Sequence, residues 1–213
     1  MPRQETARWS VVVPYYNERN YLPAMLASLK AQTVRPLDLI LVDNASTDGS
    51  PDIARAMLAD ADGVDAVFLH EPTPGQAAAL ERGIAQTSTE FTAICDADTL
   101  YPPDYLERAE ALYDSQGLDV AAILATPLYD APDCLDSKLR SLKMRIVPHI
   151  LRGQCHTGGY AHTFRTEALK HAGGYSRKVW PHLRKDHELI HRIWKEGRII
   201  HAPNLWCRAS DRR

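Results

Sequence analysis

Two carboxylates that follow a short apolar segment could bind a divalent metal ion. The segment Phe91–Cys95 leads directly into Asp96-Ala97-Asp98. Strand side chains two residues apart lie on the same side, so both carboxylates can point into one site. Ligands of open α/β sheets bind beyond the carboxyl ends of strands. Hard oxygen donors placed there suit Mg²⁺ or Mn²⁺ that also bridges to phosphate. A solvated acidic turn is the simpler alternative, because this pattern alone is weakly specific.

A third carboxylate follows another apolar segment. Leu37–Val42 ends at Asp43, so a parallel arrangement would place Asp43 at the same edge of the sheet as Asp96 and Asp98. There it could accept hydrogen bonds from a base N–H or a ribose hydroxyl. The alternative is that residues 43–50 only form a turn with helix-capping residues.

The segment His187–His191 matches the H-E-x-x-H pattern of zinc hydrolases. On a helix His187 and His191 share a face and could bind zinc, with Glu188 as the base. The longer zinc motifs need Gly and His where this chain has Trp194 and Gly197. A surface or interface histidine is therefore favoured at His191, and a zinc hydrolase is kept as the alternative from another enzyme class.

Alternating strands and helices would position these residues. Four segments rich in Val, Ile, Leu and Phe predict strands buried on both faces, and they are Trp9–Val13, Leu37–Val42, Ala66–Leu69 and Phe91–Cys95. The gaps contain helical patterns at Tyr21–Leu29, from Ser50 onward and at Gln76–Ile84. This alternation predicts βαβ units and a mostly parallel sheet.

The pattern changes after residue 100. Helices are predicted from Asp104 to about Ser115, at Asp136–Arg152, at Glu167–His171 and at Lys185–Lys195, and strands at Val120–Ala125, Gly158–Phe164, Arg198–His201 and Leu205–Arg208. Neither a repeat nor a low-complexity linker interrupts the chain. The sequence therefore predicts a single domain over residues 1–213.

The net charge of −2 conceals a strong asymmetry. Residues 1–135 carry a net charge of −13, and residues 136–213 carry +11. Such asymmetry suggests an anionic partner for the basic part, although two oppositely charged halves that pack together would produce the same asymmetry. Nucleic acid is disfavoured, because the acidic part would repel its backbone.

Composition excludes several classes of protein. The 213 residues are 45% hydrophobic and 24% charged, which is typical of a globular chain. No apolar run approaches the ~18–20 residues of a membrane-spanning helix. Residues 1–8 lack an apolar signal core, so we expect a cytoplasmic protein. The four cysteines form no C-x-x-C pair, which favours buried free thiols.

Several segments, in order, resemble family 2 glycosyltransferases. The first three are Val11–Glu18, Leu41–Ser50 and Asp96–Asp98. The likeness continues with Gly159–Arg165 (G-x-x-x-x-F-R), Gly173–Tyr175 (similar to G-G-F) and Asp186–Leu189 (similar to E-D-x-E-L). The resemblance implies the GT-A fold, which is α/β with a Rossmann-like, mostly parallel central sheet and helices on both faces. Residues of about 1–100 would form the nucleotide-sugar-binding half, and about 101–213 the acceptor-binding half.

The resemblance also implies a reaction and its residues. An inverting enzyme would move a sugar from a nucleotide-sugar donor, with a UDP-sugar favoured, to an acceptor hydroxyl with Mn²⁺ or Mg²⁺. Donor binding is implied for Pro14, Tyr15, Tyr16, Glu18, Asp43, Gln76, Asp96, Ala97 and Asp98. Asp98 would be the main metal ligand, Asp96 would face ribose or metal, and His201 could be a third ligand. Asp186 matches the catalytic base, and acceptor binding is assigned to Gly158, Gly159, Trp180, Lys185 and Glu188. Lys185 stands where the family usually has Glu.

The acceptor is expected to be a glycan, a lipid-linked molecule or a small molecule. The basic segment 136–152 could form an amphipathic helix that lies on an anionic membrane surface, or it could cover the core with a solvated face. An inactive nucleotide-sugar-binding protein of the same fold is the remaining alternative. The presence of Asp43, Asp96, Asp98 and Asp186 together argues against it.

Overall fold

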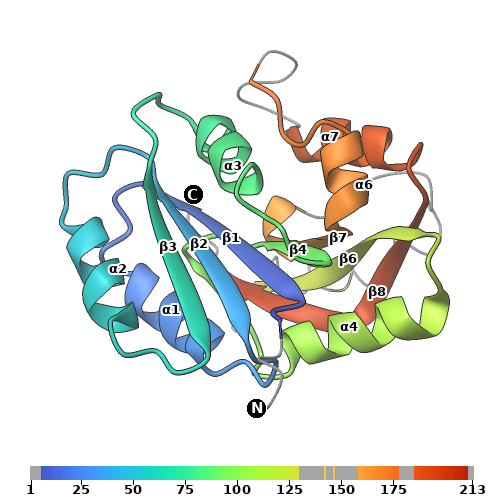
Figure 1. Cartoon of the computed structure of the whole chain (residues 1–213), viewed down its shortest axis with the longest axis horizontal. Coiled ribbons are helices and arrows are strands. Elements are labelled where there is room, and N and C mark those ends of the chain that lie inside the picture. Colours follow the sequence, from blue (N-terminus) through green and yellow to red (C-terminus); the bar gives the residue numbers. More distant parts are fainter. Residues whose placement is uncertain (1–5, 130–141, 143–145, 147–157, 178–184, 211–213) are drawn as a thin grey trace.

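The computed structural model describes residues 6–129, 142, 146, 158–177 and 185–210 (Figure 1). Its strands are β1 (Trp9–Tyr15), β2 (Leu37–Asp43), β3 (Val64–His70), β4 (Phe91–Ile94), β5 (Thr99–Leu100), β6 (Val120–Tyr129), β7 (His162–Arg165) and β8 (Arg198–Ala209). Its helices are α1 (Leu22–Lys30), α2 (Ser50–Leu58), α3 (Gln76–Ile84), α4 (Tyr105–Gln116), α6 (Thr166–His171) and α7 (Lys185–Ile193), with a 3-10 turn η1 (Gly159–Ala161).

One sheet of eight strands runs through the described residues in the order β3-β2-β1-β4-β7-β6-β8-β5. The pairs β3–β2, β2–β1 and β1–β4 are parallel, as the alternation of strands and helices predicts. The second part is mixed, because β7 runs antiparallel to both β4 and β6 whereas β6 and β8 are parallel. The α/β class and the predominantly parallel sheet are therefore confirmed, and strands from both predicted halves share one sheet.

Helices cover both faces of the sheet, and the strands supply alternate side chains to each face (Figure 1). Val11 and Val13 of β1 belong to the core cluster under α1, α2 and α4, whereas Val12 between them packs into the cluster under α3, α6 and α7. This alternation explains why the strands are apolar at nearly every position. The predicted helices on both faces are confirmed.

Helix α3 lies very close to the sheet because Gly83 has no side chain. A Cβ atom at Gly83 would come within 2.5 Å of Val12 Cγ1 and 3.0 Å of Val42 Cγ2. The glycine therefore sets how near the start of α3 lies to the ends of β1 and β2.

Three predicted strands differ from the structure. Arg198–His201 and Leu205–Arg208 were expected as separate strands, but they belong to the single strand β8. Its pairing with β6 shifts register between Ala202 and Trp206, where Pro203 has no N–H to donate. The strand predicted at Gly158–Phe164 begins only at His162, because residues 159–161 form η1.

Some predictions fall outside the described residues. These concern Cys134, Cys155, Trp180 and most of the basic segment 136–152. Within that segment Leu142 and Ile146 are described, and both are helical and exposed. Cys95 and Cys207 are free and buried, as expected. Among the described residues, we find no helix with the length and apolar character needed to cross a membrane.

Candidate functional site

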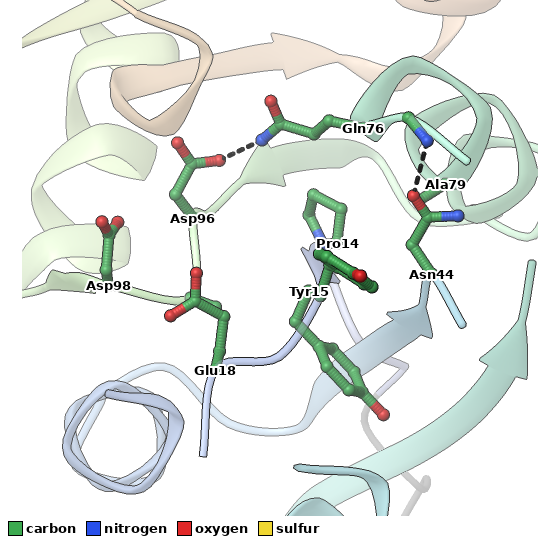
Figure 2. Close-up of a pocket in the computed structure, with 11 residues that line it drawn as sticks. Pro14, Tyr15, Glu18, Asn44, Gln76, Ala79, Asp96 and Asp98 are labelled. Carbon is green, nitrogen blue, oxygen red and sulfur yellow. Dashed lines mark hydrogen bonds between the residues drawn. The ribbon is translucent and has the colours of Figure 1, made fainter. Parts of the chain in front are cut away.

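A cavity of about 380 Å³ lies beyond the carboxyl ends of β1, β2 and β4 and beside the start of α3 (Figure 2). It is lined by Pro14, Tyr15, Tyr16, Glu18, Asn44, Gly75, Gln76, Ala79, Asp96, Ala97 and Asp98. Every residue predicted to bind the donor lines this cavity except Asp43. The position agrees with the rule that ligands of parallel sheets bind at the carboxyl ends of strands.

Backbone-to-side-chain hydrogen bonds join the loop after β1 to the loop after β2. The N–H groups of Asn17 and Glu18 donate to the hydroxyl oxygens of Ser46 and Ser50 at 3.0 and 2.9 Å. In return, the N–H of Thr47 donates to Asn17 Oδ1 at 2.8 Å. These contacts explain why the two polar sequence segments occur together, since each loop satisfies backbone groups of the other. These hydrogen bonds hold the two loops together on one side of the cavity, and Glu18 of the first loop faces the cavity.

Asn44 lines the cavity, although the sequence did not identify it as a site residue. Its amide nitrogen donates to the carbonyl oxygens of Glu71 and Thr73 at 2.9 and 2.7 Å, and its Oδ1 accepts from the N–H of Gly75 at 2.8 Å. Asn44 therefore connects the end of β2 to the loop that leads into α3. The sequence signal that could have identified Asn44 is its position directly after Asp43, at the end of a predicted strand.

Asp43 lies next to the cavity and is buried. Its Oδ1 accepts from the N–H of Ser46 at 3.0 Å, and its Oδ2 lies 3.0 Å from Nδ1 of His70. His70 is the partner of Asp43 in the β2–β3 register, so the strand pairing itself brings the two side chains together. Both carboxylate oxygens thus already have a protein contact.

Asp96 and Asp98 lie on the side of the cavity opposite Asn44 (Figure 2). Asp96 Oδ1 accepts a hydrogen bond of 2.7 Å from Gln76 Nε2. Burial and, after it, the negative charge of Asp98 together raise the pKa of Asp96 to about 7. A divalent cation bound between the two side chains would relieve the repulsion that Asp98 exerts on Asp96.

The donor set fits a cation that keeps several ligands from outside the protein. No group of three His, Cys, Asp or Glu side chains able to hold a metal occurs in the part of the chain that the structure describes. His201 pairs with Leu124 inside the sheet and does not line the cavity. Mg²⁺ and related cations are often held by one or two carboxylates together with phosphate oxygens and water. Asp96 and Asp98 match that requirement.

Asp186 lies at the start of α7, in a second cluster. Its Oδ1 accepts a 2.8 Å hydrogen bond from the hydroxyl of Tyr175, and its Oδ2 lies 3.7 Å from Lys185 Nζ. Gly159 of η1 packs against the pair, since a Cβ there would lie 2.6 Å from Asp186 Oδ1. The charges of Lys185 and Asp186 both affect the pKa of Asp96, so the two clusters are electrostatically coupled. Trp180, predicted for the same region, lies outside the described residues, and Gly158 directly precedes η1.

Within the described ranges, no third His, Cys, Asp or Glu joins the H-E-x-x-H residues to form a metal site. Glu188 uses both carboxylate oxygens to pair with Arg192 at 2.6 Å each. His187 and His191 are both exposed. Glu188, predicted to contact the acceptor, is thus held in a salt bridge within α7.

Comparison with known proteins agrees with the geometry. The profile described as glycosyl transferase family 2 matches residues 10–153. An uncharacterized glycosyltransferase of Nostoc sp. is 30% identical over 195 residues, which cover 91% of this chain and 58% of that protein.

Two solved structures share the fold. Mannosyltransferase PcManGT of Pyrobaculum calidifontis, in complex with GDP-Man and Mn²⁺, has a TM-score of 0.73 at 24% identity, over 96% of this chain and 57% of that chain. TarS 1–349 of S. aureus, in complex with UDP-GlcNAc, has a TM-score of 0.70 at 18% identity, over 97% of this chain and 59% of that chain.

The predicted GT-A fold is therefore confirmed. The chain spans less than 60% of the length of each of these three proteins. Because the family profile covers more than half of the sequence, the chain belongs to glycosyl transferase family 2.

Proposed function

We propose that this protein transfers a sugar from a nucleotide-sugar donor to an acceptor hydroxyl, with inversion at the anomeric carbon. The observation that carries the proposal is the cavity of about 380 Å³, in which the predicted donor residues meet the Asp96–Asp98 pair. A UDP-sugar is the favoured donor, supported by the fold shared with TarS in complex with UDP-GlcNAc. The acceptor is a glycan, a lipid-linked molecule or a small molecule.

In this proposal Asp98 and Asp96 hold Mn²⁺ or Mg²⁺. When bound, the ion would neutralise negative charge on the departing diphosphate. Gln76 donates to Asp96 Oδ1 and so fixes how that carboxylate faces the cavity. The fold shared with PcManGT, solved in complex with GDP-Man and Mn²⁺, supports a divalent ion.

Tyr16 and Asp43 are proposed to hold the nucleoside. Tyr16 lines the cavity and is 58% exposed, which leaves its ring accessible for stacking on a base. Each oxygen of Asp43 can accept a second hydrogen bond beyond the one it has, because an ionised carboxylate offers about four lone-pair sites. Asp43 can therefore accept hydrogen bonds from a nucleoside that approaches from the cavity side.

Asp186 is proposed as the base that removes the proton of the acceptor hydroxyl as it attacks the anomeric carbon. It lies in the first turn of helix α7, where the helix dipole attracts negative charge. A positioned carboxylate of this kind contributes about 10²–10⁴-fold to a rate.

A thermal-shift panel tests the donor assignment. Wild-type protein is mixed with Mn²⁺ and a series of UDP-, GDP- and dTDP-sugars, and the melting temperature is recorded for each. We expect one nucleotide class to raise it, with a UDP-sugar strongest, because a ligand that binds only the folded state stabilises it. No response to any nucleotide would contradict the donor site.

The base is tested with Asp186→Asn and the donor that responds. Acceptor-dependent turnover should fall by about 10²-fold or more, because the amide cannot take the proton. The donor-induced thermal shift should remain, since Asp186 does not line the donor cavity. Glu167→Gln, an exposed substitution on α6, serves as the control and should leave turnover unchanged. Unchanged turnover in Asp186→Asn would remove Asp186 from the mechanism.

A further inference from the structure

Tyr175 presents a buried hydroxyl group to the side chain of Asp186. The tyrosine is 2% exposed and its ring belongs to the core cluster that includes Val12, Ile84 and Phe164. A phenylalanine would fill this apolar space equally well. The hydroxyl therefore has a separate role, and it donates a 2.8 Å hydrogen bond to Asp186 Oδ1.

The contact fixes one oxygen of the carboxylate. Oδ1 is bound to the tyrosine, whereas Oδ2 lies 3.7 Å from the ammonium group of Lys185. Gly159 makes the arrangement sterically possible, because a Cβ at that position would lie 2.6 Å from Oδ1 and 2.8 Å from the tyrosine hydroxyl oxygen. The plane of the carboxylate is thus set by its neighbours and not by solvent.

Arg192 holds the turn of Tyr175 against the helix of Asp186. Its guanidinium group forms the two-pronged pair with Glu188, one turn along α7. The same group donates to the carbonyl oxygen of Gly174 at 2.7 Å and to that of Ala172. Because Gly174 directly precedes Tyr175, this arginine holds the tyrosine hydroxyl next to the carboxylate of Asp186.

We propose that Tyr175 is a positioning residue for the base: it holds Oδ1 of Asp186 so that Oδ2 is directed to the acceptor hydroxyl. The inference deepens the proposed function and rests on it. In that step the acceptor oxygen forms a bond to the anomeric carbon and gives its proton to Asp186. The bond from that carbon to the nucleoside diphosphate breaks, and the diphosphate leaves with the electron pair.

The substitution Tyr175→Phe removes only the hydroxyl. We expect kcat to fall about tenfold, as for loss of a hydrogen bond to a charged group, with the donor KM unchanged within about twofold. Tyr113→Phe is the matched control, because that tyrosine is also fully buried and its hydroxyl lies 3.3 Å from Thr163 Oγ1. It should retain the wild-type kcat. An equal fall in both variants would show a general packing effect and overturn the proposal.

The pH dependence of kcat separates positioning from packing. Among the described residues, the charged groups that act on this region include Lys185, beside Asp186 on α7, and Asp96, beyond β4. Loss of a donor to the carboxylate should move the acid limb of the Tyr175→Phe profile to higher pH. The pH profile of kcat for Tyr113→Phe should coincide with that of the wild type. An unshifted limb together with a wild-type kcat in Tyr175→Phe would overturn the inference.

Gly159→Ala provides a test that does not alter the tyrosine. The added methyl group displaces the hydroxyl and the carboxylate from each other, so kcat should fall more than about tenfold while the donor-induced thermal shift remains. Wild-type kcat in this variant would contradict the proposal even if Tyr175→Phe failed to fold. If the proposed role of Asp186 as the base were wrong, Asp186→Asn would also retain full turnover. This result distinguishes failure of the proposed function from failure of the Tyr175 proposal alone.

Discussion

At the residue scale, the ionised carboxylate of Asp96 lowers the stability of the folded protein, and the same carboxylate is proposed to bind the metal ion. The carboxyl group has an ordinary pKa of 3.8, and burial with the charge of Asp98 raises it to about 7 in the folded protein. Between about pH 4 and pH 7 the folded state therefore holds a proton that the unfolded chain has lost. Stability contributed at this position falls as the pH rises through that window. The cost is fully present above pH 7, where a bound cation would offset it.

Replacing Asp96 by Asn removes this cost. In EDTA the Asp96→Asn variant should melt at a higher temperature than the wild type at pH 8, and the difference should shrink at pH 5, where the folded wild type is protonated. Added Mn²⁺ should stabilise the wild type but not the variant. Asp52→Asn, on the exposed face of α2, is the control and should follow the wild type at both pH values. A variant less stable than the wild type at pH 8 would contradict this account.

The sequence identified most of the cavity residues but not how each side chain is used. A strand end and its spacing were enough to place Asp96 and Asp98 at the cavity. Asp43 and Asn44 are consecutive, so they point to different sides, and the sequence alone did not show that Asn44 faces the cavity. The contact of Tyr175 with Asp186 joins residues from a turn and a helix, and such a contact depends on tertiary packing.

At the element scale, helix α3 determines where Gln76 meets Asp96. The helix lies against β1 and β2 through Gly83, where no side chain would fit without a shift of its neighbours. The position of the first turn of α3, which carries Gln76, therefore depends on a residue two turns away.

Gly83→Ala tests this dependence. A methyl group 2.5 Å from Val12 Cγ1 forces the helix away from the sheet, which should reduce the free energy of unfolding by about 1–3 kcal/mol. Urea unfolding followed by circular dichroism measures the loss. Arg82→Ala, an exposed neighbour on the same helix, should change stability by less than about 0.5 kcal/mol. Gly83→Ala with wild-type stability would show that α3 is not held by this contact.

Strand and helix identities were largely predictable because apolar alternation and helical spacing are local signals. The β1–α1–β2–α2–β3–α3–β4 order follows the sequence closely. The misjudged elements, β8 and η1, depend on a register shift at Pro203 and on the close packing of Gly159 against Asp186. Both features involve contacts with distant parts of the chain, of β8 with β6 and of Gly159 with Asp186, and local periodicity carries no information about such contacts.

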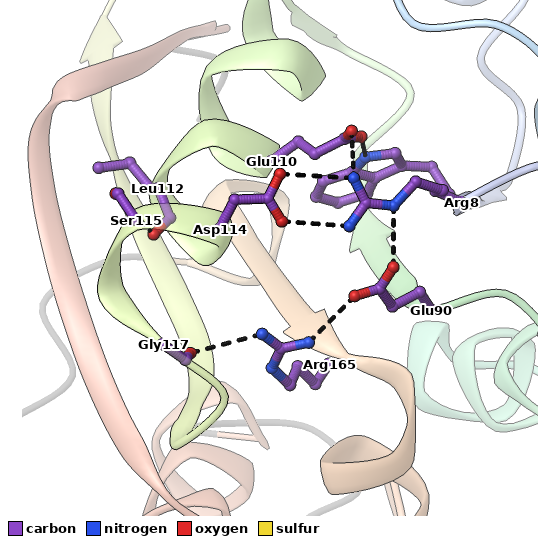
Figure 3. A network of polar contacts seen from close by, with 9 residues as sticks. Arg8, Glu90, Glu110, Leu112, Asp114, Ser115, Gly117 and Arg165 are labelled. Carbon is purple, nitrogen blue, oxygen red and sulfur yellow. Dashed lines mark hydrogen bonds and ion pairs between the residues drawn. The ribbon is translucent and has the colours of Figure 1, made fainter.

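At the scale of the whole molecule, part of the charge asymmetry is accounted for by ion pairs between the acidic and basic parts of the sequence. Within the described part of the chain, three ion pairs join the acidic and basic parts of the sequence: Arg165–Glu90 at 3.2 Å, Arg177–Glu81 at 2.9 Å and Arg198–Asp119 at 2.6 Å. The first belongs to a network at the amino ends of β1 and β4, where Arg8 also binds Glu90, Glu110 and Asp114 (Figure 3). This network lies at the end of the sheet opposite the cavity.

The two ends of the sheet therefore differ in character. At the amino ends of the strands, carboxylates are matched by arginines, and Arg165 also lies 5.3 Å from the ring centres of Phe91 and Tyr113. At the carboxyl ends, Asp96 and Asp98 line an open cavity, and the charge of Lys185 lowers the pKa of Asp96. The Asp96–Asp98 pair thus lies at the end of the sheet where the proposed metal and diphosphate would bind.

The most direct test of the central claim is titration calorimetry of the responding nucleotide-sugar, with and without Mn²⁺, against wild type and Asp98→Ala. The proposal predicts binding to the wild type that weakens at least about tenfold when Mn²⁺ is omitted, and a similar loss in Asp98→Ala with Mn²⁺ present. Asp52→Ala should bind like the wild type. Equal affinity in Asp98→Ala and wild type, with or without Mn²⁺, would contradict a donor site built on this carboxylate pair.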